Sequence, residues 1–152
     1  MIVVLDQEKV YNKIRHDYLW NTLESFNQPK EFIKMTKCLY ENAHMQVVIN
    51  GVMSEPFQVK WGVCQGDPLS CLQFNLAIEP LGCKLRNCNS LEGLSFLGKE
   101  GRLLVNLFAD NTTLYLSQND KFNTVEKILK DWCKILGAKF NLEKTKIIPI
   151  GI

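Results

Sequence analysis

Two aspartates lie where a charged side chain is costly. Asp6 follows an apolar run at residues 2–5, and Asp110 lies between two runs that are otherwise hydrophobic. A carboxylate beside the buried face of a sheet is expensive to desolvate unless a cation or a donor compensates it. If both carboxylates extend from one rim of a sheet, they offer the hard oxygen ligands that Mg²⁺ prefers, and the expected chemistry is nucleotidyl transfer. The alternative is that Asp6 caps a turn and Asp110 is only a turn former.

The strands that would position these aspartates are predicted from residue periodicity. Residues 2–5 form a continuous apolar run with three β-branched residues, typical of a strand that is buried on both faces and ends at Asp6. Residues 103–108 and 112–116 are β-rich runs joined around Asp110-Asn111, and both of these residues accept unusual turn geometry. We therefore predict one strand and one hairpin that carry the two aspartates.

Helices account for most of the remaining sequence. Apolar residues recur at helical spacing in residues 17–26, 69–81 and 125–136, and Pro29 suits the first turn of another helix that reaches about residue 41. Asp67-Pro68 is a typical helix start, and Gly137 is a typical helix end.

Two further β elements complete the expected fold. Asn50-Gly51 lies between residues 47–49 and 57–59 and favours a tight hairpin turn, and residues 147–150 suit a last short strand. The sum is an α+β domain with a mostly antiparallel sheet and helices packed on one face.

Length and composition favour one compact domain and leave its partners open. The chain has 152 residues, 46% of them hydrophobic, which is enough for one core and too little for two ordinary domains. No apolar run approaches the ~20 residues of a membrane span, and no secretory signal follows Met1, so we expect an intracellular protein without a membrane partner. The net charge of +2 is compatible with nucleic acid but also with small metabolites.

Four segments, in this order, resemble the motifs of reverse transcriptases from LINE-type (non-LTR) retrotransposons. The matching strings are LDQEKVYNKIRHDYL for motif A, GVCQGDPLS for motif B, LFADN for motif C and GAKFNLEKTKIIPIG for motif D. The segment NGVMSEPFQV resembles the hairpin that precedes motif B. The resemblance covers essentially all of residues 1–152 and implies a polymerase palm of ferredoxin-like topology, as a partial domain.

The resemblance also implies roles for individual residues. Asp6 and Asp110 would bind Mg²⁺ or Mn²⁺, and Lys144 would lie near the triphosphate and assist the departing pyrophosphate. Tyr11 would lie under the incoming sugar, and Gln65 and Gly66 would touch the template and the forming base pair. The implied partners are an RNA template, a DNA primer and a dNTP. The alternatives from the residues alone are that Tyr11 is a core aromatic, that Gln65-Gly66 is a simple loop before a helix, and that Lys144 is a solvated lysine.

Three departures from these motifs indicate a weakened site. Asn111 stands where motif C has a second catalytic aspartate, which removes one of three negative charges around the metals. Cys64 replaces the motif B arginine, and Asn12 stands where a second motif A aspartate is common. We therefore expect a weakened metal site in a decaying copy of the element.

The chain also begins close to its first motif. Met1 lies five residues before Asp6, so we expect most of the fingers, and the thumb beyond Ile152, to be missing. Positioning by such elements supplies about 7–11 kcal/mol of a barrier in well-oriented reactions. We therefore expect the isolated chain to be inactive as a polymerase.

Two other hypotheses remain open at this stage. One is a catalytically dead nucleic-acid-binding module, for which Tyr18, Tyr40 and Trp61 are candidate stacking residues. Lysines at positions 30, 34 and 37 fall on one helical face and would track a phosphate backbone or simply be solvated. The other is a relic of a retroelement with no selected role.

Overall fold

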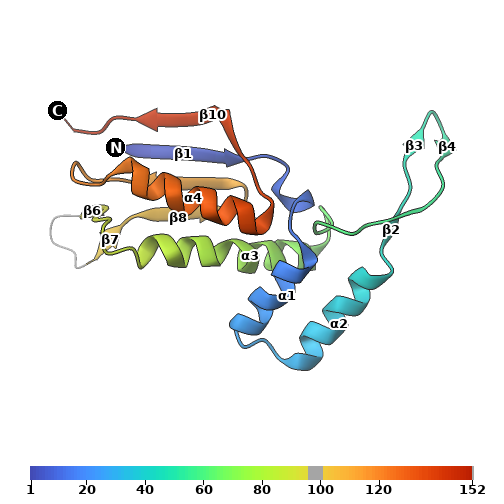
Figure 1. Cartoon of the computed structure of the whole chain (residues 1–152). Helices are drawn as coiled ribbons and strands as arrows, with labels where there is room; N and C mark the ends of the chain where they lie inside the picture. Colours follow the sequence, from blue (N-terminus) through green and yellow to red (C-terminus); the bar gives the residue numbers. More distant parts are fainter. Residues whose placement is uncertain (96–100, 152) are drawn as a thin grey trace.

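A four-stranded antiparallel sheet is the centre of the structure, a computed structural model that describes residues 1–95 and 101–151. The strand order is β10 (Phe140–Ile148), β1 (Ile2–Gln7), β9 (Asn111–Tyr115) and β8 (Val105–Phe108). Helices α3 (Pro68–Arg86) and α4 (Phe122–Leu136) cover one face of this sheet (Figure 1). The predicted α+β class, with an antiparallel sheet and helices on one face, is confirmed.

Most of the remaining elements extend from one end of the sheet. A short 3-10 helix η1 (Val10–Asn12) follows β1 and leads into α1 (His16–Ser25) and α2 (Lys30–Glu41). A hairpin arm then projects away from the body (Figure 1). It consists of two short strand pairs, β2 (His44–Met45) with β5 (Phe57–Gln58) and β3 (Val48–Ile49) with β4 (Val52–Met53). A third pair, β6 (Leu94–Ser95) with β7 (Arg102–Leu103), lies at the opposite end.

The core lies between the sheet and its two covering helices. In β1, Val3, Leu5 and Gln7 are buried, whereas the residues between them are half-buried. In α4, the five residues with helical spacing are all buried, namely Val125, Ile128, Leu129, Trp132 and Leu136. Because side chains alternate across a strand, Asp6 projects to the face of the sheet opposite to Leu5 and Gln7. The fold therefore places this carboxylate away from the helices.

Local signals set several element ends as predicted. The Asp67 carboxylate caps α3 by accepting hydrogen bonds from the Leu69 amide (3.1 Å) and the Ser70 hydroxyl (3.3 Å). Gly137 ends α4 with a left-handed φ of 78°. Asn50 and Gly51 form the predicted tight turn, with φ values of 51° and 80°.

Several strand predictions were wrong in their bounds or partners. Residues 57–59 were expected to pair across the Asn50-Gly51 turn, but β5 pairs with β2, and only β3 and β4 flank the turn. The last strand is not a short one at residues 147–150, because β10 already begins at Phe140. The first strand is not buried on both faces and continues beyond Asp6 to Gln7. Pairing partners depend on the tertiary fold, so runs of apolar residues do not determine them.

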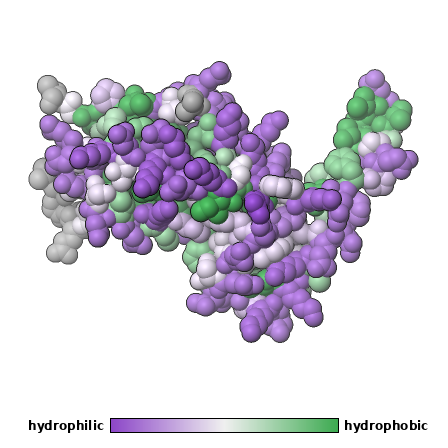
Figure 2. All heavy atoms as spheres, in the orientation of Figure 1, coloured by the Kyte–Doolittle hydropathy of each residue, from purple (hydrophilic) through white to green (hydrophobic). Residues whose placement is uncertain are grey.

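The tip of the hairpin arm carries exposed apolar side chains. Val48, Ile49, Val52 and Met53 are all exposed there, and Figure 2 shows them as a hydrophobic patch at the far end of the arm.

In the described part of the chain, no helix combines the length and the apolar character that crossing a bilayer requires.

Candidate functional site

The two aspartates lie at the same end of the sheet. Asp6 lies directly across from Asn111 on β9 and from Asn141 on β10. The Gln7 amide donates a hydrogen bond of 3.1 Å to the backbone carbonyl of Asp110. Both aspartates line a hollow of about 590 Å³, together with Lys144 and Asn141. We call Asp6, Asp110, Asn111 and Lys144 the acidic edge, and this hollow the carboxylate pocket.

The turn between β8 and β9 differs from the predicted one. Its two loop residues are Ala109 and Asp110, because Phe108 pairs with Asn111, which is already the first residue of β9. Ala109 adopts a φ of 50°, a left-handed conformation that costs an alanine about 1–2 kcal/mol. The predicted apex at Asp110-Asn111 is therefore wrong by one residue. As a result, Asn111 lies in the strand on the same face as Asp6 rather than at the tip of the turn.

A β-bulge brings Lys144 to the acidic edge. Val4 pairs with Lys146 and Asp6 pairs with Asn141, so β10 has three more residues in this interval than β1 has. The Asn141 side-chain oxygen accepts hydrogen bonds from the amides of Glu143 (3.0 Å) and Lys144 (3.3 Å), which stabilises the irregular segment. Lys144 Nζ lies 3.5 Å from Asp6 Oδ2. The bulge thus turns this lysine back toward the carboxylate.

Both carboxylates are partly compensated by protein groups. Asp6 faces the Lys144 ammonium. Asp110 Oδ1 accepts a hydrogen bond of 3.2 Å from the Asn111 side-chain amide. An aspartate at position 111 would have no such donor and would add a negative charge instead. The asparagine therefore replaces charge repulsion with a hydrogen bond at this edge.

The acidic edge fits a divalent ion held by two carboxylates. Mg²⁺ is usually bound by one or two carboxylates together with substrate phosphates. Asp6 and Asp110 line one pocket together with Glu8, which pairs instead with Lys139, and Asn111 adds at most a carbonyl oxygen. Within residues 1–95 and 101–151, no three His, Cys, Asp or Glu side chains converge on a potential metal position. The donor set therefore suits a site with two carboxylates rather than three.

A second hollow adjoins the acidic edge and contains residues from three separate segments. Tyr11, Gln65, Gly66 and Asp110 all line this tyrosine pocket, which has a volume of about 460 Å³. The Tyr11 ring stacks on Phe74 of α3, with ring centroids 4.7 Å apart and an angle of 19° between the planes. Burial raises the pKa of the Tyr11 phenol, and contact with Cys71 and the charge of Asp110 raise it further. The Tyr11 phenol is therefore neutral, and its ring lines the pocket in a fixed orientation.

The loop with Gln65 and Gly66 is held against the segment with Tyr11 by close backbone contacts. The amides of Gly62 and Val63 donate hydrogen bonds to the carbonyls of Ile14 (2.7 Å) and Tyr11 (2.8 Å). Gly62 has a φ of 85°, and a Cβ atom there would lie 2.7 Å from the Tyr11 carbonyl oxygen. Glycine is the residue that allows this approach.

The comparisons with known proteins agree with these features. A family model described as reverse transcriptase (RNA-dependent DNA polymerase) matches residues 1–150. The chain belongs to the reverse transcriptase family. Together with the two transposable-element relatives described next, this match confirms the predicted resemblance to reverse transcriptases of non-LTR retrotransposons.

Two curated relatives come from transposable elements. One is the transposon TX1 uncharacterized 149 kDa protein of Xenopus laevis, 30% identical over 93% of this chain and 11% of that protein. The other is the retrovirus-related Pol polyprotein from type-2 retrotransposable element R2DM of Drosophila melanogaster, 31% identical over 98% of this chain and 14% of that protein. The reverse transcriptase chain thus spans less than a sixth of the length of these two relatives.

Solved structures support the fold. A telomerase from Candida tropicalis, truncated from its C-terminal domain, matches with a TM-score of 0.71 and 18% identity, over 95% of this chain and 30% of that one. A telomerase from Candida albicans in complex with the TWJ fragment of telomeric RNA matches with a TM-score of 0.71 and 15% identity, over 97% of this chain and 26% of that one. The predicted palm fold of the reverse transcriptase domain is confirmed by these similarities.

Two of the three motif departures face one further hollow. Asn12 and Cys64 both line a space of about 420 Å³ in the reverse transcriptase domain, next to Lys60 and Trp61. An arginine at position 64 and an aspartate at position 12 would face the same space with opposite charges. Because both charges are absent here, neither residue leaves an unpaired charge in the hollow.

Sequence reasoning missed two residues at the acidic edge of this reverse transcriptase. Gln7 is buried and lines both the carboxylate and the tyrosine pockets. Its side-chain amide donates to the Thr112 hydroxyl at 3.3 Å, whereas its Oε1 has no hydrogen-bond partner within the described residues. Asn141 was quoted within the motif D string but was assigned no role. Alternation along β1 past Asp6 would have indicated Gln7, but the register that brings Asn141 to Asp6 is a tertiary feature.

Proposed function

We propose that residues 1–152 form one palm unit of an RNA-directed DNA polymerase from a non-LTR retrotransposon, with a weakened metal site. Asp6 and Asp110 are its metal ligands, and its substrates are an RNA template, a DNA primer and a dNTP. The observation that carries the proposal is the shared carboxylate pocket, which Asp6 and Asp110 both line, with Lys144 Nζ 3.5 Å from Asp6 Oδ2. The family match and the RNA-bound telomerase neighbour support it.

Each residue of the two pockets has a distinct part in this proposal. A divalent ion held by Asp6 and Asp110 would activate the primer hydroxyl and neutralise phosphate charge. Lys144 donates hydrogen bonds to the leaving pyrophosphate from its position beside Asp6. Tyr11, fixed against Phe74, limits the space beside the sugar. The Gly66 backbone, with a φ of 101° and open space around it, approaches the template base.

Low activity follows from two of the charge-removing departures, at Asn111 and Cys64. Asn111 lies directly across from Asp6 and supplies no third carboxylate. Cys64 lacks the planar donor fork that an arginine offers to phosphate and bases. Each loss of about 1.4 kcal/mol of transition-state stabilisation reduces the rate tenfold, so two such losses reduce synthesis strongly.

Primer extension on an RNA template with Mg²⁺ or Mn²⁺ tests this proposal. We expect little product from the unmodified chain and at least about a tenfold gain from the double variant Asn111→Asp, Cys64→Arg. Adding Asp6→Asn to this double variant should return synthesis to the starting level. Strong processive synthesis by the unmodified chain would contradict the weakened site, and a gain that survives Asp6→Asn would show that Asp6 is not a metal ligand.

A further inference from the structure

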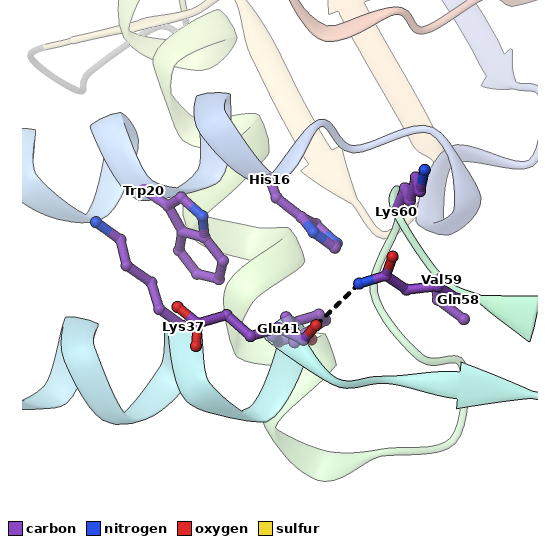
Figure 3. A pocket seen from close by; sticks show the side chains of 8 residues that line it. His16, Trp20, Lys37, Glu41, Gln58, Val59 and Lys60 are labelled. Carbon is purple, nitrogen blue, oxygen red and sulfur yellow. Dashed lines mark hydrogen bonds between the residues drawn. The ribbon is translucent and has the colours of Figure 1, made fainter.

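An aromatic pocket lies outside the acidic edge. His16, Trp20, Lys37, Tyr40, Gln58 and Lys60 line this space of about 400 Å³, which lies between α1, α2 and the segment of β5 (Figure 3). Among the residues that the structure describes, it shares no lining residue with the carboxylate pocket or the tyrosine pocket. The polymerase chemistry proposed above therefore leaves this pocket without a role.

Three aromatic rings in this pocket are held in fixed positions. The rings of His16 and Tyr40 lie 5.0 Å apart at 67°, and those of Trp20 and Tyr40 lie 5.8 Å apart at 66°. Tyr40 is buried and donates its hydroxyl hydrogen to Gln73 of α3 at 2.6 Å. A ring nitrogen of His16 lies 2.9 Å from the Gly62 carbonyl oxygen. Trp20 is half-buried and lines the pocket.

A row of lysines leads away from the pocket along α2. Lys30, Lys34 and Lys37 line a neighbouring hollow of about 540 Å³, and Lys37 lines both this hollow and the aromatic pocket. The row extends for ~10 Å along the helix axis, which matches about three phosphates of a stacked strand. Lys37 Nζ lies 5.9 Å from the centre of the Trp20 ring. Positive charge therefore begins beside the accessible indole.

Two carboxylates near this row are compatible with an anionic ligand. Glu24 pairs with Lys37 at 3.7 Å, but its side chain is exposed, and exposed ion pairs of this kind contribute little to stability. Glu41 lines the aromatic pocket itself, where a carboxylate accepts hydrogen bonds from the N–H groups of a base. For a nucleic-acid ligand, a base would therefore lie in the pocket, and its phosphates would lie along α2.

We propose that the aromatic pocket and the lysine row together bind single-stranded nucleic acid, with one base stacked on Trp20 and the adjoining phosphates on Lys30, Lys34 and Lys37. Base stacking on aromatic side chains combined with a basic track is the general mode of single-strand binding. This site is additional to the template contact proposed at Gly66, because Gly66 lines the tyrosine pocket. It does not depend on catalysis.

Tryptophan fluorescence reports directly on this site. Trp132 is buried, so in a Trp61→Phe background Trp20 is the tryptophan that a ligand reaches. A ten-nucleotide RNA should quench this fluorescence in a salt-dependent titration, and a DNA of the same sequence shows whether the sugar matters. An abasic strand of the same length carries the phosphates without bases and should quench much less.

Charge-reversal variants separate the lysine row from a general electrostatic effect. Lys34→Glu with Lys37→Glu should weaken binding at least about tenfold and reduce the salt slope by about 1.4, because each lost phosphate contact in a single strand contributes ~0.7. Lys127→Glu with Lys134→Glu, on exposed positions of α4, makes the same change in net charge and should weaken binding less than about threefold. Equal weakening by both pairs, equal quenching by the abasic strand, or no quenching by RNA or DNA would overturn the proposal.

Discussion

Replacing Asn111 with aspartate should increase the affinity for Mn²⁺ by about ten- to a hundredfold. The new carboxylate would lie directly across from Asp6 on the same face of the sheet. Two unit charges 4 Å apart interact by about 4 kcal/mol at the effective dielectric constant near a protein surface. Exposure of position 111 and repulsion from Asp6 and Asp110 reduce the gain to about 1.4–2.8 kcal/mol. Calorimetric titration with Mn²⁺ measures this gain in binding free energy.

The matched control for this variant is Asn106→Asp. Asn106 is an exposed residue of β8 whose partner on β9 is Thr113, two pairs further from the turn than Asn111. The Asn106→Asp variant therefore adds the same charge to the same face of the sheet, but away from Asp6. We expect less than about a threefold change in Mn²⁺ affinity, because an exposed charge at this distance is screened. Similar gains from both variants would mean that general negative charge, rather than a ligand at position 111, attracts the ion.

Replacing Gly62 with alanine should destabilise the domain by about 3–5 kcal/mol. Its left-handed φ of 85° costs an alanine about 1–2 kcal/mol. The added Cβ would also lie 2.7 Å from the Tyr11 carbonyl oxygen and 2.8 Å from Asn12 Cα, both of them backbone atoms that cannot rotate away. The combined penalty falls at the upper end of single-residue effects. Urea denaturation followed by circular dichroism measures the loss.

A second glycine separates the two causes. Gly51 has a φ of 80°, but a Cβ atom there would meet nothing within 4 Å. Gly51→Ala should therefore show the backbone cost alone, about 1–2 kcal/mol. If Gly62→Ala costs no more than Gly51→Ala, the close approach between the Gln65-Gly66 loop and the Tyr11 segment is not present in solution.

The sequence predicted those parts of the fold that local chemistry determines. The start of α3 follows from Asp67 and Pro68, the end of α4 from Gly137, and the hairpin turn from Asn50-Gly51. In each case a side chain or a backbone conformation within a few residues sets the structure. The pairing of β5 with β2 could not be predicted in this way, because strand partners are chosen by long-range packing.

The motif strings predicted which residues belong to the candidate site, but they did not predict its geometry. The strings identified Asp6, Asp110 and Lys144, which the structure brings to one pocket. The means by which Lys144 reaches Asp6 is a bulge in β10, and a bulge cannot be inferred from a run of alternating residues. The turn at Ala109-Asp110 was misplaced for a related reason, because an alanine with positive φ is an unfavourable local choice that the surrounding sheet imposes.

Paramagnetic broadening by Mn²⁺ tests directly whether Asp6 and Asp110 form one divalent-ion site. In an amide NMR spectrum of the whole chain, low Mn²⁺ concentrations should first broaden the signals of the backbone amides at the end of β1 and at the β8–β9 turn. Asp6→Asn should remove this broadening from both segments together. Broadening that is confined to one segment, or that persists in Asp6→Asn, would contradict a shared site.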